Sequence, residues 1–177
     1  MPKSSVRHHD PGIALATVTG TANTFTAIQR NTAQPAFQAQ LQTSDANATG
    51  DGTSYRLGSG NALIEIFDQS SNNNTNGTFT APVTGKYMIG ASIRIQQIST
   101  DMTEVDIRLV TSNRTYNYTA IGGAADGGGD YHLAESVLAD MDADDTFTVT
   151  ALLSNGAKAA DILGATTTTR MWGYLVC

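Results

Sequence analysis

The sequence feature that most constrains the fold is a strict alternation of apolar and polar residues after a corner at Pro82 and Gly85. Pro82 has a fixed φ and no backbone N–H to donate, so it belongs at a corner or a sheet edge. Gly85 tolerates backbone conformations closed to other residues, which suits a sharp re-entry into a strand. Every second residue of 87–95 is apolar, and this period of two predicts a half-buried strand.

Several other segments of the chain are short and strand-like. Alternating or β-rich runs occur at residues 36–41, 62–67, 104–111, 131–140, 146–153 and 166–176. Only 15% of the residues are charged, and the abundant Thr, Asn and Gly are mediocre or poor helix formers. This composition favours short strands joined by polar turns. About nine or ten strands without a long helix predict an all-β sandwich.

The residues around the corner also carry a family resemblance. Phe79, Ala81, Pro82, Gly85 and Tyr87 resemble the signature of the complement component 1q globular head, a domain related to tumour necrosis factor. Further segments are similar to the other strands of that family in the same order: residues 35–39, 64–68, 136–138, 145–149 and 171–176.

The chain departs from the family in two respects. Asp144 stands where the family usually has Gly, so the late hairpin turn is expected to differ, and no collagen-like Gly-X-Y repeats are present. The resemblance covers residues 34–176. It implies a jelly-roll β-sandwich that assembles as a homotrimer around a threefold axis.

The sequence predicts two parts, an N-terminal arm at residues 1–33 and a jelly-roll head at residues 34–177. The arm begins with a polar stretch that contains Arg7, His8 and His9, and continues with short apolar runs. A segment of this kind is too short for a core of its own and needs something to pack on. We therefore expect an anchoring arm, or an extra strand along the head.

Four aromatic residues are candidates for the trimer interface. By position, the family resemblance implicates Phe79, Tyr87, Trp172 and Tyr174, because aromatic residues near the signature and closing strands line the threefold axis in that family. The alternative is that these residues are core aromatics of a single subunit. The sequence leaves the two interpretations open.

No catalytic or cofactor motif is present. The glycine-rich stretch 122–129 lacks the Lys-Ser/Thr and helix pattern of a phosphate-binding loop. The aspartates of residues 140–145 lack the middle Gly and closing Glu of an EF-hand, so a solvated acidic turn is favoured over a calcium site. A Ser–His–Asp site built on His132 has no support from sequence order. We expect no enzymatic activity, no cofactor and no metal ion.

Two loops and a glycine-rich turn are the candidate ligand-binding segments. Polar residues at the predicted ends of the sandwich are suited to hydrogen bonding with a ligand. The candidates are Asn73, Asn74, Asn76, Asp126 and Asn155.

Charge and processing signals limit the partners. The net charge of −6 and the lack of a basic stripe disfavour nucleic acid, and no apolar run approaches the length of a membrane span. No secretory signal is recognisable, and the single Cys177 cannot form an internal disulfide, which suits synthesis in a reducing cytoplasm.

These observations lead to two functional hypotheses. The first is a viral structural protein located in the virion and made in the host cytoplasm: a trimeric bacteriophage capsid decoration or head-fibre protein. Its residues 1–33 would bind the major capsid protein or another virion protein. The alternative is a receptor-binding head that recognises a glycan or protein on the host surface.

Overall fold

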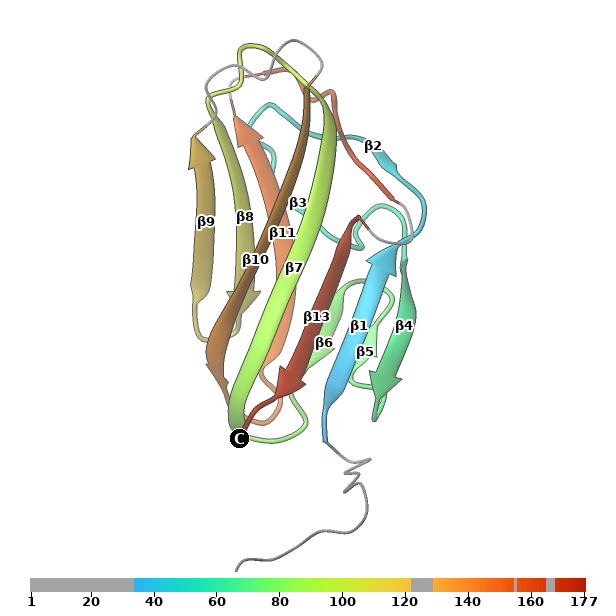
Figure 1. Cartoon of the computed structure of the whole chain (residues 1–177), viewed down its shortest axis with the longest axis vertical. Helices are drawn as coiled ribbons and strands as arrows, with labels where there is room; N and C mark the ends of the chain where they lie inside the picture. Colours follow the sequence, from blue (N-terminus) through green and yellow to red (C-terminus); the bar gives the residue numbers. More distant parts are fainter. Residues whose placement is uncertain (1–33, 122–128, 155, 165–167) are drawn as a thin grey trace, which may run out of the picture. The chain divides into compact units, whose positions relative to one another are not determined.

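A computed structural model describes residues 34–121, 129–154, 156–164 and 168–177 (Figure 1). The predicted arm at residues 1–33 and the candidate residues Asp126 and Asn155 lie outside the described residues. The described part belongs to one compact unit and contains thirteen strands but no helix. Within these ranges, no helix has the length and apolar character that crossing a bilayer requires.

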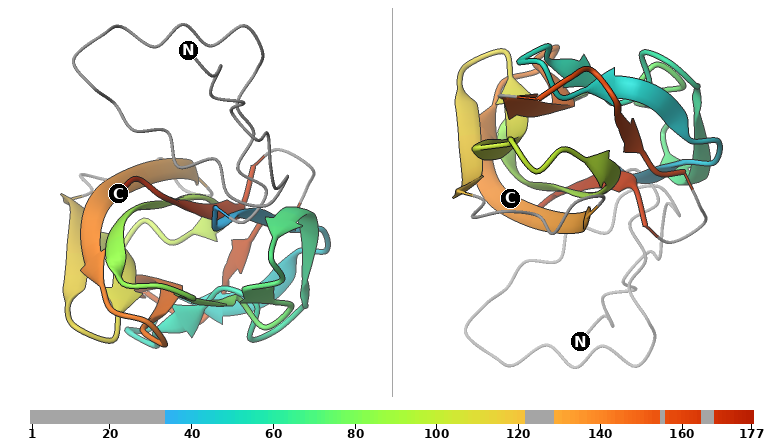
Figure 2. Two further views of the ribbon diagram at one scale, coloured as in Figure 1. Left: turned by 90° about the horizontal axis from the view of Figure 1, so that it is seen from below. Right: turned by 90° about the horizontal axis from the view of Figure 1, so that it is seen from above.

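The strands form two sheets. Sheet A contains β1 (Ala36–Leu41), β2 (Asp45–Thr49), β4 (Leu63–Gln69), β7 (Gly85–Ile98), β10 (Gly129–Met141), β12 (Ala160–Ile162) and β13 (Arg170–Leu175). Sheet B contains β3 (Tyr55–Arg56), β5 (Asn73–Asn74), β6 (Thr78–Thr80), β8 (Glu104–Thr111), β9 (Thr115–Ile121) and β11 (Thr146–Ser154). Seen along the long axis, the sheets are two layers around a common interior (Figure 2).

All strand pairs are antiparallel. In sheet A the order is β4–β1–β13–β7–β10, and β12 and β2 continue the sheet beside the far end of β7. In sheet B the order is β5–β6–β11–β8–β9, and β3 pairs with β11 beyond β6. Neighbours in space are therefore distant in sequence, since β1 lies between β4 and β13, and the predicted all-β sandwich is confirmed.

The long strand β7 carries the predicted alternation. Tyr87, Ile89 and Ile93 are among the inward-facing residues of this strand, and all of them are fully buried. The opposite face of β7 is less exposed to solvent than the alternating pattern predicts. Gly90 lies beneath the ring of Trp172, where an added Cβ would come within 2.5 Å of Cζ2. Ser92 is only 2% exposed. Thus β7 is covered on much of both faces.

Two of the predicted interface aromatics belong to the core. Phe79 and Tyr87 are completely buried in the subunit. The ring of Phe79 stacks on Phe37 with centroids 4.6 Å apart, and the ring of Tyr87 meets it at 5.8 Å. The Tyr87 hydroxyl donates a hydrogen bond to the Val83 carbonyl at 2.8 Å. Neither side chain has surface to offer to another copy, so the interface prediction is wrong for these two residues.

At the corner before β7, the backbone of Cys177 lies very close to Gly85. Gly85 does not have a positive φ; instead, a Cβ there would lie 2.6 Å from the Cys177 carbonyl oxygen. The N–H of Lys86 donates to that oxygen at 2.7 Å. At the late hairpin, Asp144 adopts φ 72°, the left-handed conformation that favours glycine. Asp144 is thus a non-glycine residue in the left-handed conformation at the turn before β11.

The buried carboxylate of Asp45 forms hydrogen bonds with the long segment between β2 and β4, which includes β3. Asp45 is 7% exposed and accepts a hydrogen bond from the Tyr55 hydroxyl. Its other oxygen accepts from the Asn61 backbone N–H at 2.7 Å and from the Asn61 amide at 2.6 Å. Burial and this hydrogen bond raise the pKa of Tyr55 above its ordinary value. If one donor were removed, a buried carboxylate oxygen would lack a hydrogen bond, and the folded protein would lose stability.

We expect Tyr55→Phe to lower the free energy of unfolding by about 1–3 kcal/mol, because one Asp45 oxygen then loses its buried donor. Urea denaturation at fixed protein concentration measures this change. Tyr131→Phe, which removes a hydroxyl with no hydrogen bond to a described residue, is the control and should shift stability by less than about 0.5 kcal/mol. Equal stability of the two variants would contradict the structural role of Asp45.

Candidate interaction surface

The outward side of sheet A contains a cluster of exposed apolar side chains. Registers place Tyr174 opposite Met88, and Met88 opposite Leu138, in one row across β13, β7 and β10. The next row includes Trp172, which lies opposite Gly90 and Gln38. Figure 1 shows these strands side by side in the front layer. We call this set the apolar face: Phe67, Met88, Leu138, Trp172, Tyr174 and Val176.

The apolar face is open to solvent in the subunit. Phe67 is 48% exposed, Tyr174 45% and Leu138 51%. On the adjoining strand β4, Ile64 and Ile66 are exposed as well. Large apolar side chains at this exposure are unremarkable singly, but a contiguous group marks an interaction site.

The apolar face contains a hollow of about 430 Å³. Its walls come from β1, β4 and β13: Ala36, Phe37, Gln38, Phe67, Arg170, Trp172, Gly173 and Tyr174. The Arg170 guanidinium lies over the Trp172 ring, 5.8 Å from its centroid, a cation–π arrangement that fixes both side chains. The hollow is therefore an aromatic depression with one positive charge at its rim.

A second hollow, of about 490 Å³, lies between β9 and β10. Its lining includes Tyr116, Tyr118, Glu135 and Val137. In the described part of the chain, β9 pairs only with β8 and β10 only with β7. Two open strand edges thus flank a tyrosine-lined groove that carries one carboxylate. We call it the β9–β10 edge.

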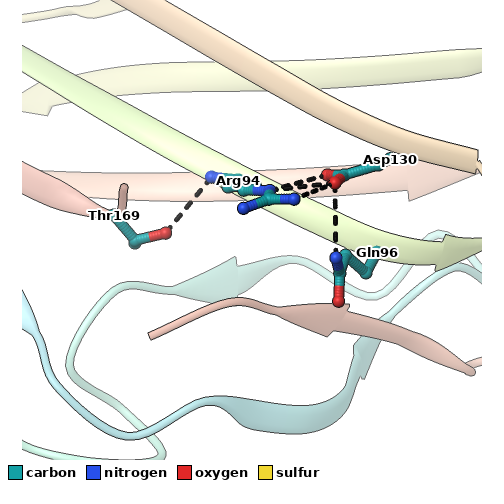
Figure 3. A network of polar contacts seen from close by, with 4 residues as sticks. All are labelled: Arg94, Gln96, Asp130 and Thr169. Carbon is teal, nitrogen blue, oxygen red and sulfur yellow. Dashed lines mark hydrogen bonds and ion pairs between the residues drawn. The ribbon is translucent and has the colours of Figure 1, made fainter. Parts of the chain in front are cut away.

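The apolar face ends in a polar network (Figure 3). Arg94 Nε donates to both carboxylate oxygens of Asp130, at 3.0 and 2.9 Å, and Nη2 makes a further contact. Gln96 donates to the same carboxylate at 3.3 Å, and the Arg94 backbone N–H donates to the Thr169 hydroxyl at 3.2 Å. The hydrogen bond from Arg94 holds the pKa of Asp130 below its usual value.

His132 meets a serine in the same region. The Ser92 hydroxyl lies 2.7 Å from His132 Nε2 and 2.9 Å from the Thr168 carbonyl oxygen, to which it donates. Because Ser92 is 2% exposed, a substrate carbonyl has no access to its oxygen. This pair is suited to joining β7, β10 and the segment before β13, and not to nucleophilic attack.

The acidic residues 140–145 form the turn of the hairpin between β10 and β11. Asp145 accepts hydrogen bonds from the Asn113 amide at 2.6 Å and from the Asp142 backbone N–H at 2.8 Å. Asp140 forms an exposed ion pair with Lys86. Among the described residues, no three His, Cys, Asp or Glu side chains are grouped so that they would hold a metal ion.

The predicted loop residues differ in their accessibility to a ligand. Asn73 is 7% exposed and points inward, so it is not available to a ligand at the surface. Asn74 is exposed, but its side-chain oxygen accepts from the Thr78 backbone N–H at 3.1 Å. Asn76 is exposed. A ligand role for Asn74 and Asn76 stays a prediction.

Sequence reasoning named Trp172 and Tyr174 as interface candidates, which stays a prediction, and did not name their neighbours Phe67, Met88 and Leu138. The sequence contained a signal for two of them, Phe67 and Leu138. Residues 62–67 are apolar on both faces of the expected strand, and Leu138 follows Val137 directly, so one of that pair must face away from the core. Leu138 does so, since it is half exposed.

Comparison with known proteins shows a likeness in structure and none in sequence. No family model and no curated protein matches the chain. The globular domain of zebrafish complement 1qA superposes with a TM-score of 0.54 at 10% identity, over 81% of this chain and 98% of that one. Murine APRIL at pH 8.0 gives 0.54 at 10% identity, over 81% and 99%. The Eiger TNF of S. frugiperda gives 0.55 at 9%, over 81% and 93%.

At these identities the likeness establishes the fold. The described chain is a jelly-roll β-sandwich of the complement 1q and tumour necrosis factor type. The fold predicted from the residues around Pro82 is confirmed.

The Arg94–Asp130 pair predicts a pH dependence. The folded-state pKa of Asp130 is lowered, so its stabilising contribution is complete above the unfolded-state pKa of about 3.9 and disappears as the pH falls through the lower folded value. Asp130→Asn should therefore lower the thermal midpoint at pH 7 and lower it less at pH 3, where the contribution of the carboxylate is smaller. Scanning calorimetry at both pH values measures the difference; an equal loss at both would exclude the ionic contribution.

Proposed function

We propose that this protein is a structural head of a bacteriophage virion, which assembles as a homotrimer and acts as a capsid decoration or head-fibre protein. The observation that carries the proposal is the apolar face, where Phe67, Tyr174 and Leu138 are about half exposed in the subunit. Monomers rarely leave a contiguous apolar patch open to solvent. Copies of the same chain are the partner that is always present at matching concentration.

The proposed contact joins two different surfaces. The apolar face of one copy receives the β9–β10 edge of the next, so the contact is head-to-tail; in this proposal the rotation between copies closes the contact into a ring of three. Tyr118, which is 44% exposed, supplies an aromatic anchor on the edge. Arg170 at the rim of the hollow and Glu135 in the groove give the two surfaces opposite charge. Three copies agree with the homotrimer that the family resemblance implies.

The virion assignment draws on the sequence. A head of this type with neither collagen-like repeats nor cysteine pairs, an acidic Asn- and Thr-rich composition and an additional N-terminal segment suit a virion surface protein. In this proposal, residues 1–33 attach the trimer to the major capsid protein or another virion protein. Binding by burial is the whole mechanism, and no catalytic step is assigned.

Substitution of Phe67 by Asp is predicted to convert the trimer to a monomer, because a charge would be buried in the contact. Val83→Asp is the matched control: Val83 is 45% exposed, lies in the corner between β6 and β7, and is not a member of the apolar face. Size-exclusion chromatography with light scattering compares the two. A Phe67→Asp protein that remains trimeric would contradict the proposed interface.

Deletion of residues 1–33 is predicted to abolish attachment to particles and leave a trimeric head, since the first strand of the described part, β1, begins at Ala36. Co-sedimentation with particles that lack the protein measures attachment of the full chain and of the truncated chain in parallel. Attachment of the truncated trimer at the level of the full chain would reject the role of the arm.

A receptor-binding head is the alternative, and the exposure of Asn74 and Asn76 on the loop side of sheet B is the observation that favours it. It uses the same trimer. Isolated heads would then bind host cells saturably, and Asn76→Ala would weaken that binding. Absence of saturable binding would remove this alternative.

A further inference from the structure

Arg170 is a partly buried cation with no anionic partner in its own subunit. Its guanidinium group lies at the rim of the hollow in the apolar face, 5.8 Å from the centroid of the Trp172 ring. None of the ion pairs among the described residues includes Arg170, and on this side of the sheet Asp130 is already bound to Arg94. A guanidinium group over an aromatic ring still has N–H donors at its edge for an anion.

Glu135 is the opposite case on the β9–β10 edge. It is partly buried and lines the groove with Tyr118 and Val137. Its Oε1 accepts a hydrogen bond from the Ser136 backbone N–H at 3.0 Å, and no cation of the described chain pairs with it. A partly buried charge without a partner costs stability. Each surface of the proposed contact therefore contains one unpaired charge, and the two charges have opposite sign.

The strand registers place these two charges at nearly the same level. Arg170 on β13 lies opposite Ser92 of β7, and Glu135 on β10 lies opposite Ala91, the adjacent residue of β7. Both β13 and β10 are antiparallel to β7 and flank it, so they run in the same direction (Figure 1). Rotation about a threefold axis along the strands leaves the level of each residue unchanged. Arg170 of one copy and Glu135 of the next are then within one residue step, about 3.4 Å, along the axis.

The apolar residues beside the two charges match at the same offset. Trp172 lies opposite Gly90 of β7, and Val137 lies opposite Ile89. The register that brings Arg170 to Glu135 therefore also brings Trp172 to Val137. A shift by two residues would instead place the Arg170 guanidinium against Val137, and a charge buried against an apolar side chain is unfavourable.

We propose that Arg170 of one copy and Glu135 of the next form a salt bridge that fixes the level at which neighbouring heads join. This inference rests on the proposed trimer and names two residues that determine the specificity of its contact. The planar guanidinium group can bind a carboxylate through two parallel hydrogen bonds. The apolar face supplies the affinity, and the charged pair excludes the shifted registers.

The test reverses the two charges in the full chain, first singly and then together, and measures trimer formation by sedimentation equilibrium over a dilution series. Arg170→Glu brings two carboxylates together in every contact, and Glu135→Arg brings two guanidinium groups together. Either change should raise the chain concentration at which half of the chains are trimeric by at least about tenfold. The combined variant restores the pair with its charges exchanged and should recover most of that loss.

Asp101→Arg is the matched control. It reverses the charge of an exposed residue between β7 and β8 that lines neither hollow, and it should form trimers like the wild-type chain. Single variants that assemble like the wild type would overturn the pairing and leave the trimer intact. A combined variant as weak as the single variants would do the same. A wild-type chain that is monomeric at every concentration would overturn the proposed function together with the pairing.

Discussion

Burial of strand β7 is the constraint on which the rest of the structure depends. Its inner face contributes Tyr87, Ile89 and Ile93 to the core, while its edges pair with β10 on one side and with β12 and β13 on the other. One strand therefore organises most of sheet A. Because β13 must lie beside it, Gly85 and Gly90 are kept free of side chains at the points of closest approach.

The same strand explains why sheet A is unfinished as a single subunit. Where Trp172 covers Gly90, the outward side of the sheet becomes aromatic, and the exposed Tyr174 and Leu138 extend this apolar surface. An antiparallel sheet usually has one face in water and polar residues there. An apolar outer face instead indicates a third layer, which a second copy supplies in the proposed trimer.

Sheet B has the opposite character. Its outward side is rich in threonine and carries Arg56 and Arg108 in one row, and its apolar residues Val110 and Leu152 are only partly exposed.

The sequence was sufficient for the architecture because a period of two is a local property that burial directly enforces. It was insufficient for the interface, because the inner or outer position of an aromatic residue depends on which strands pair. Phe79 and Tyr87 lie in β6 and β7 with their side chains inward, whereas Trp172 and Tyr174 alternate with buried Met171 and point outward. The row of Arg56 and Arg108 joins residues 52 positions apart, and only the register brings them together.

The central claim is that the apolar face is covered by other copies of the chain. Sedimentation equilibrium of the wild-type protein over a wide concentration range tests it most directly. The account predicts one species of about three times the 18.6 kDa chain mass. A mass of 18.6 kDa at every concentration would contradict it.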